Sequence, residues 1–345
     1  MLIIMNENIE IVDMVLHYVG NSFTEEGVLL ADHTMKVSKD VDPFLRFFFL
    51  SPFKMEALCN FFHESELGKN KIYTLVNNIF ENHNTLVNNS AEIASFLYDH
   101  SNHPKIKGGY FFVVLFKNIE VEHHLVEAIG LFKIENTENF LCINRGTGGT
   151  TVVSENGISI KKLDKGCLIL NIEKEKGYVV SVIDKTPRGS EAKYWVDDFL
   201  HVVPRNDGYN QTKRTAHLCK DYVRSLAGNV DKSQRAMMLN RLKELLKEPY
   251  FDIRKMVDRV FEDNNIAQEF LKYNQNISNG KGLGIVDNFK TDPSALKKLS
   301  FGNLTNIHLD NNFGISIRGG EDLLEKGYDE ERGMKYYKLY FKEEK

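Results

Sequence analysis

Cysteine is scarce in this sequence, and its spacing argues against two classes of protein. The chain has four cysteines (Cys59, Cys142, Cys167 and Cys219), and no two of them form a Cys-x-x-Cys pair. Such scattered thiols suit a reduced cytoplasmic protein better than a disulfide-bonded or zinc-binding one. No apolar run approaches the roughly 18 residues that span a bilayer, and the start of the chain lacks the basic segment that opens a signal peptide. We therefore expect a cytoplasmic protein without a membrane partner.

Common catalytic and nucleotide-binding motifs are missing as well. The sequence contains no Gly-x-Ser-x-Gly, His-Glu-x-x-His or Gly-x-Gly-x-x-Gly motif, and no internal repeat or low-complexity run. Residues 145–151, RGTGGTT, resemble a phosphate-binding loop but lack the Gly-Lys-Ser/Thr ending and do not lead into a helical pattern. We predict a hairpin turn between two strands there, and we expect neither an enzyme nor a bound cofactor or metal.

One group of charged residues imitates a metal-dependent nuclease. Asp184, Glu191 and Lys193 follow the order Asp…Glu-x-Lys, in which two carboxylates hold Mg²⁺ and the lysine orients a water. The spacing is short, and Glu191 and Lys193 border a helical pattern rather than a strand. A polar connection between elements is therefore favoured over catalysis, and the nuclease is kept as a hypothesis.

The stretch 107–184 has the pattern of an antiparallel sheet. Apolar, β-prone runs recur in it and are cut every few residues by Gly, Asn or Asp. The runs 110–117 and 168–172 are apolar at nearly every position, which predicts central strands. The composition, 42% hydrophobic and 27% charged, is sufficient for such a core. We predict an α+β fold: an antiparallel β-sheet core with N-terminal helices, a basic helical section and a C-terminal β-hairpin region.

Helical and strand patterns flank the sheet section. Strands are predicted over 9–19 and within 304–341, and Ser90 is predicted to be the N-cap of a helix. Apolar spacing and capping residues predict helices over 53–67, 70–82, 91–100, 191–203, 212–226, 231–247 and 252–273, with a loop over 276–284. Because Pro204 to Gly208 has the composition of a boundary, we predict two domains, 1–203 with the sheet and 204–345 with basic helices followed by short strands.

Charge is unevenly distributed along the chain. The whole chain carries a formal −4, but residues 204–247 contain ten basic and four acidic residues, a local +6 that leaves −10 elsewhere. In the predicted helix 212–226 four basic residues are spaced 4, 3 and 4 apart and fall on one stripe. Such a stripe suits a DNA backbone, although a merely solvated helix face has the same pattern. The predicted DNA contacts are Lys213, Arg214, His217, Lys220, Arg224, Lys232, Arg235 and Lys243.

Four segments resemble one protein family. They are HPKIKGGYFFVVLF (103–116), EAIGLFKIENTENFLCI (127–143), GISIKKLDKGCLILNIEKEKGYVVSVID (157–184) and EAKYWVDDFLHV (191–202). The chain resembles the bacterial nucleoid-associated protein family, in its Bacteroidetes-like form, over nearly its whole length. The resemblance implies association with the nucleoid, binding of double-stranded DNA and a cytoplasmic location. It carries over no catalytic residue.

Three functions stay open from the sequence. The leading hypothesis is a nucleoid-associated homodimer that binds double-stranded DNA with little sequence specificity. The second is a protein–protein adaptor that reaches the nucleoid through other nucleoid proteins; the acidic net charge and the aromatic end of the chain, with Tyr336, Tyr337 and Tyr340, support it. The third is the nuclease described above.

Overall fold

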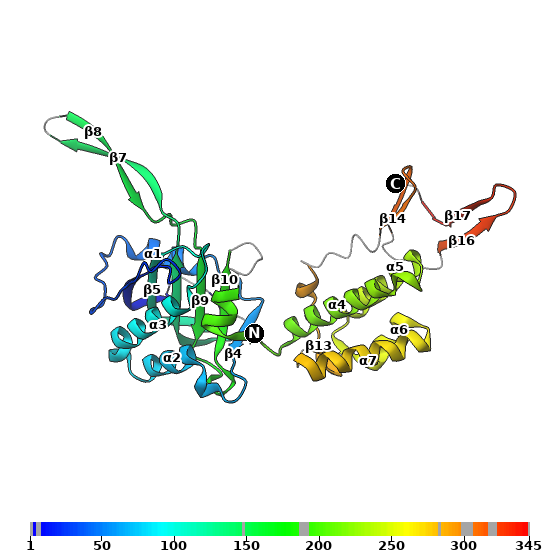
Figure 1. Cartoon of the computed structure of the whole chain (residues 1–345), viewed down its shortest axis with the longest axis horizontal. Helices are drawn as coiled ribbons and strands as arrows, with labels where there is room; N and C mark the ends of the chain where they lie inside the picture. Colours follow the sequence, from blue (N-terminus) through cyan, green and yellow to red (C-terminus); the bar gives the residue numbers. More distant parts are fainter. Residues whose placement is uncertain are drawn as a thin grey trace. The chain divides into compact units, whose positions relative to one another are not determined.

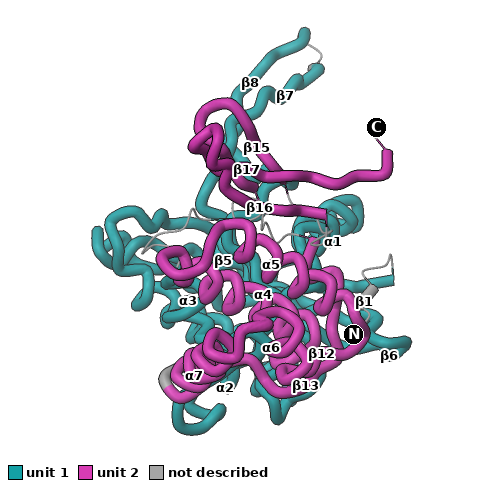
Figure 2. The backbone as a smooth tube through the Cα atoms, turned by 90° about the vertical axis from the view of Figure 1, so that its right-hand side faces the viewer, with its two compact units in different colours: residues 1–205 teal, residues 206–345 magenta. Residues whose placement is uncertain are grey.

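The chain divides into two compact units, residues 1–205 and 206–345, shown in separate colours in Figure 2. The computed structural model describes residues 3–4, 8–146, 149–185, 193–281, 284–297, 306–316 and 323–343. Each unit has its own hydrophobic core. Helices and antiparallel strands both contribute to the fold, which confirms the predicted α+β class.

Unit 1 is built on one large antiparallel sheet (Figure 1). Its strands are β1 (Ile3–Ile4), β2 (Glu10–Val19), β3 (Val28–Leu29), β4 (Leu58–Phe61), β5 (Gly109–Val121), β6 (His124–Ile134), β9 (Lys165–Leu170), β10 (Val179–Asp184) and β11 (Val202–Pro204). They follow the order β11–β4–β10–β9–β6–β5–β2–β3, with β1 also paired to β5. The predicted strand over 9–19 is therefore confirmed as β2, and the two predicted central strands are β5 and β9, inside the sheet.

Both faces of this sheet are buried. Val113 and Leu115 of β5 belong to a core shared with α2 (Lys71–Glu81), α3 (Leu86–His100) and the π-helical segment η5 (Tyr194–Leu200). Phe112 and Val114 belong to a second core with α1 (Asp42–Leu50). Because alternate side chains of a strand point to opposite faces, β5 has to be apolar at nearly every position. Short 3-10 turns complete the unit: η1 (Leu67–Lys69), η2 (His83–Thr85) and η3 (Lys174–Lys176).

One hairpin of unit 1 is separate from the large sheet. β7 (Glu138–Gly146) and β8 (Gly149–Gly157) pair with each other as a two-stranded sheet that projects from the rest of the unit (Figure 1). β7 ends at Gly146 and β8 begins at Gly149, opposite it, which confirms the predicted hairpin; residues 147–148 lie outside the described part.

Unit 2 is mainly helical. Its helices are α4 (Gly208–Ser225), α5 (Lys232–Leu245), α6 (Ile253–Phe261) and α7 (Asn264–Lys281), with the 3-10 turns η6 (Leu226–Gly228) and η7 (Pro293–Leu296). Three two-stranded sheets accompany them: β12 (Tyr250–Asp252) with β13 (Asn288–Lys290), β14 (Asn306–Leu309) with β15 (Phe313–Ser316), and β16 (Leu324–Asp329) with β17 (Met334–Leu339). The short strands predicted for the tail are confirmed.

The predicted helix over 53–67 is wrong, and α1 was not predicted. Leu58 and Phe61 have helical spacing and are both buried, but they lie in β4. This strand pairs with β10 on one side and β11 on the other, with Phe61 opposite Val202. Pairing on both edges satisfies its backbone groups and outweighs the local helical pattern.

Other predicted boundaries also shift. Ser90 is not an N-cap: α3 begins at Leu86, and the Ser90 hydroxyl donates to the carbonyl of Val87 at 2.8 Å. The helix predicted over 252–273 is two helices, because the backbone at Glu262 has a φ of 48°, and α7 continues into the expected loop as far as 281. The helix predicted over 191–203 gives way to β11 at Val202, and residues 191–192 lie outside the described part.

Candidate nucleic-acid interface

Helix α4 has one face inside unit 2 and one face in solvent. Asp207 is its N-cap and accepts from the backbone N–H of Asn210 at 2.9 Å, which starts the helix four residues before the predicted boundary. Cys219, Tyr222 and Val223 lie in the hydrophobic core, where the Tyr222 ring packs against aromatic rings of α6 and α7. The apolar face is therefore fixed by packing, and the opposite face is presented outward.

The outward face of α4 carries the predicted basic stripe. Lys213, His217 and Arg224 are exposed and Lys220 is half-buried. Their spacing of 4, 3 and 4 places them along one side of the helix, as the sequence indicated. Within the described ranges, neither Lys213 nor Arg224 forms an ion pair with a carboxylate. Their charge is available to a partner.

Arg214 follows Lys213 but is less exposed. It is half-buried, and desolvation lowers the pKa of its guanidinium. A guanidinium still carries its charge at neutral pH. Arg214 therefore adds to the positive potential near the stripe while lying partly inside the fold.

The predicted residues of α5 are less uniform than those of α4. Lys243 is exposed, whereas Lys232 and Arg235 are half-buried. The Nε atom of Arg235 is buried and has no hydrogen-bond partner among the residues that the structure describes. Since Ala236 beside it packs against Ile307, this side of α5 is covered by the C-terminal strands. The structure thus gives α4 a continuous basic face and α5 only one fully exposed cation of the three.

Other basic residues of the section 204–247 are neutralised inside the protein. Arg241 pairs with Glu262 at 2.9 Å and Lys247 with Glu244 at 2.6 Å. Arg205, which belongs to unit 1, pairs with Glu173. Glu244 is already counted in the local +6, so acids outside the section compensate two of these six charges, and α4 carries most of the exposed basic residues that remain.

A second polar site, in unit 1, was not predicted from the sequence. Lys133 of β6, Lys165 of β9 and Asp184 of β10 stand directly opposite one another on three neighbouring strands. The exposed fraction is 0% for the Lys133 side chain and 1% for that of Lys165. Two lysines facing each other on adjacent strands repel unless acids compensate them. The signal in the sequence was a lysine at the end of each of two strongly apolar runs.

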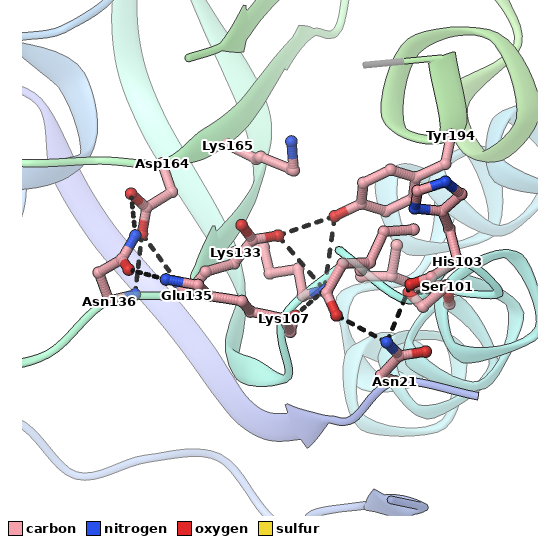
Figure 3. A network of polar contacts seen from close by, with 12 residues as sticks. Asn21, Ser101, His103, Lys107, Lys133, Glu135, Asn136, Asp164, Lys165 and Tyr194 are labelled. Carbon is pink, nitrogen blue, oxygen red and sulfur yellow. Dashed lines mark hydrogen bonds and ion pairs between the residues drawn. The ribbon is translucent and has the colours of Figure 1, made fainter. Parts of the chain in front are cut away.

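Acids and an aromatic ring compensate the two buried lysines. Lys165 Nζ lies 2.8 Å from Asp184 Oδ1, and Lys133 Nζ donates to the carbonyl of Lys107 at 2.8 Å and lies 3.5 Å from Glu135 Oε1. Figure 3 shows the Tyr194 hydroxyl beside Glu135, to which it donates at 2.9 Å. Burial lowers the pKa of Lys133 to about 8, against the opposing effect of Glu135.

The network joins η5 to the sheet. Both ammonium groups lie over the Tyr194 ring, at 5.5 Å for Lys133 and 5.0 Å for Lys165, so the first residue of η5 has cation–π contacts in addition to its hydrogen bond. Burial raises the pKa of the Tyr194 hydroxyl well above its ordinary value, and this keeps it protonated as a donor. The network explains how a π-helical segment is held at one position on the sheet.

The same network bears on the nuclease pattern. Asp184, its first carboxylate, forms an ion pair with Lys165 rather than with Lys193, which is exposed. Glu191 lies outside the described residues. Across the ranges that the structure describes, no group of three His, Cys, Asp or Glu side chains is placed to hold a metal ion.

The fold and the charged surface together define an α+β protein with a sheet-based unit and a helical unit that carries a basic face on α4. Comparison of the sequence with protein families identifies the chain more closely: the family described as nucleoid-associated protein YejK matches residues 15–332, and the chain belongs to this family. A comparison with curated proteins finds no match. None of the helices in the described ranges is both long and apolar enough to cross a membrane.

Proposed function

We propose that this protein is a cytoplasmic, nucleoid-associated protein that binds double-stranded DNA with little sequence preference through the outer face of α4. The observation that supports this most is the row Lys213, His217, Lys220 and Arg224 on one face, opposite a face fixed in the core. Membership of the nucleoid-associated family supports the same conclusion. The contacts proposed in support are Arg214 beside the row and Lys232, Arg235 and Lys243 on α5.

Phosphates, rather than base edges, are the expected targets of this face. Each phosphate neutralised by a lysine or arginine releases counterions, which gives binding a strong salt dependence and no sequence information. A protein with a formal charge of −4 needs such a local surface, since DNA responds to the field where it binds and not to the total charge.

The proposal includes a homodimer. A two-fold assembly presents two copies of the α4 face, and if both reach one duplex the number of phosphate contacts doubles. The salt dependence of binding then doubles as well, so a dimer should show a steeper salt slope than a monomer.

The test is DNA affinity measured over a series of salt concentrations. In the variant Lys213→Glu, Lys220→Glu, Arg224→Glu we expect weaker binding and a shallower plot of log affinity against log salt, by about one unit per lost phosphate contact. The matched control is Lys36→Glu, Lys39→Glu, Lys54→Glu in unit 1, which changes the net charge equally at three exposed lysines. The control should keep the original slope.

Two results would overturn the proposal. One is an α4 variant with the slope of the unaltered protein, and the other is an equal loss of slope in both variants. Comparing unrelated duplexes of equal length completes the test, because phosphate contacts predict similar affinities for all of them.

A second candidate function is the adaptor, and the C-terminal hairpin favours it. β16 and β17 form a two-stranded sheet, and large side chains near its end are exposed, with exposed fractions of 45% for Tyr340 and 72% for Phe341. Exposed aromatic side chains on a free sheet are typical of protein contacts. If the protein is an adaptor, the purified protein should not retard DNA in a gel at low or moderate salt.

The nuclease hypothesis has its own test. Plasmid DNA is incubated with the protein and Mg²⁺ or Mn²⁺, and plasmid that stays intact counts against a nuclease.

A further inference from the structure

The β7–β8 hairpin, hereafter the arm (residues 138–157), pairs with no third strand in the chain as described. Its nine residue pairs run from Glu138 opposite Gly157 to Gly146 opposite Gly149, a length of about 30 Å at the usual rise per residue. In the described part of the chain no other strand pairs with either edge. An isolated two-stranded hairpin is only marginally stable in water, so an arm of this length is expected to gain stability from a partner.

The arm exposes apolar side chains on both faces. The exposed fractions are 73% for Leu141, 66% for Ile143 and 61% for Val152. These side chains share one face of the arm, because Leu141 and Ile143 are two positions apart in β7 and Val152 is paired with Ile143. Phe140 and Val153 are exposed on the other face, at 47% and 39%. A row of apolar residues on a projecting strand marks a site of macromolecular contact.

The charges of the arm argue against DNA as this partner. Arg145 is its single basic residue, and Glu138 and Glu155 are acidic. A β-ribbon that follows a phosphate backbone needs several cations. The partner is therefore a protein surface with an apolar strand edge.

We propose that the arm binds the arm of a second copy of this chain, with the two β7 edges antiparallel and Cys142 on the two-fold axis. Cys142 is the middle residue of β7. With Cys142 opposite its counterpart, Leu141 of each copy stands opposite Ile143 of the other, so two apolar cross-strand pairs form on one face. The result is a four-stranded sheet in place of two isolated hairpins.

The edge is suited to pairing with itself. β7 contains no proline and no lysine, which are the residues that usually protect a free edge. In the proposed register Glu138 stands opposite Gly146 and Arg145 opposite Asn139, so no two like charges face each other across the edge. Because Lys162 already pairs with Glu138 at 2.5 Å, the apolar middle of the strand is the main source of association. This contact supports the homodimer proposed above and does not depend on DNA binding by α4.

The mass of the full-length protein in solution tests the arm. We expect a dimer by light scattering or sedimentation, and a monomer for Leu141→Glu, Ile143→Glu, which places four acids together on one face of the joined sheet. The matched control is Leu29→Glu, Leu125→Glu, at positions exposed by 72% and 65% elsewhere in unit 1. It should remain a dimer.

Two further measurements fix the register and exclude misfolding. Mixing the Glu variant with Leu141→Lys, Ile143→Lys should restore a heterodimer, because each acid then stands opposite a base. Mild oxidation should give a covalent dimer that Cys142→Ser abolishes, since opposite Cα atoms in antiparallel strands are about 4.5–5.5 Å apart, within disulfide reach.

The outcomes separate this inference from DNA binding. A monomeric unaltered protein, or a Glu variant that dimerises as well as the control, would overturn the arm contact. Loss of the arm contact leaves the α4 residues in place, so the monomeric variant should still bind DNA with a salt slope that responds to the α4 substitutions. Failure of DNA binding with an intact dimer would instead count against α4.

Discussion

Unit 1 and unit 2 each contain a distinctive set of basic residues, which is buried in unit 1 and exposed to water in unit 2. Lys133 and Lys165 are buried in the sheet of unit 1, where acids and the Tyr194 ring surround them. Lys213 and Arg224 of unit 2 lie on the exposed face of α4 with no acid paired to either in the described residues. The buried set holds structure together, and the exposed set is free to bind.

The difference teaches how to separate structural from functional charge. A buried charge has lost its hydration and depends on its partners, so removing one partner leaves the other uncompensated. An exposed cation keeps its hydration, and its removal costs the fold almost nothing. The free energy of unfolding therefore distinguishes the two sets.

The largest effect is expected for the buried ion pair. Lys165→Met removes the ammonium that lies 2.8 Å from Asp184 Oδ1, and we expect unit 1 to lose about 3–5 kcal/mol of unfolding free energy. Urea denaturation followed by fluorescence measures this, because the single tryptophan, Trp195, is buried in unit 1. Adding Asp184→Leu should recover much of the loss. A single variant as stable as the original protein would show that the pair is not structurally important.

A buried histidine gives unit 1 a pH-dependent stability. Burial lowers the pKa of His17 to about 4, and its Nδ1 accepts from the backbone N–H of Ala31 at 3.1 Å, a bond that protonation breaks. The unfolded chain takes up this proton near pH 6.5 and the folded chain near pH 4, so stability is lost as pH falls through that window. The loss amounts to about 3 kcal/mol.

Comparison with His17→Gln isolates this contribution. The difference in unfolding free energy between the two proteins, measured by Trp195 fluorescence, should shrink as the pH is lowered from 7 to about 4. A difference independent of pH would show that His17 is not the titrating group.

Unit 2 should be sensitive to its helix caps instead. The Asp231 carboxylate accepts from the backbone N–H groups of Ser233 and Gln234 at the start of α5, at 2.9 and 3.1 Å. Asp231→Ala should lower the stability of unit 2 by about 1 kcal/mol, measured by the far-ultraviolet dichroism of its helices. Asp231→Asn keeps a capping oxygen and should lose less. Equal losses in both variants would point to the ion pair of Asp231 with Lys326 as the main contribution.

The smallest effect on stability is expected on α4. Lys213→Gln with Arg224→Gln should change the unfolding free energy of unit 2 by less than about 0.5 kcal/mol, because both side chains are exposed and unpaired within the described ranges. The same variant should weaken DNA binding. A large loss of stability would show that Lys213 and Arg224 support the fold, as the buried lysines of unit 1 do, and the proposed difference between the units would be wrong.

The sequence was sufficient to predict an element wherever its local pattern agrees with its tertiary contacts. The apolar run of β5 predicted a central strand because both of its faces are buried, and the spacing on α4 predicted its basic face because the apolar face is continuous. Capping by Asp231 and Asp252 also followed from residue type.

The features that the sequence did not predict depend on contacts between segments that are distant along the chain. β4 has helical spacing and becomes a strand only because β10 and β11 pair with it. The row of Lys133, Lys165 and Asp184 is set by the register of three strands, which no local pattern encodes. Strand order leaves the arm outside the large sheet, because β6 pairs directly with β9, so the exposed face of the arm appears only in the structure.

The two faces of α4 have one more consequence, for how such a protein changes over generations. Substitutions on its outer face alter charge without disturbing the core formed by Cys219, Tyr222 and Val223. Affinity for a polyanion can therefore be raised or lowered in small steps while the chain remains folded. Selection on binding strength and selection on foldability act on different residues of one helix.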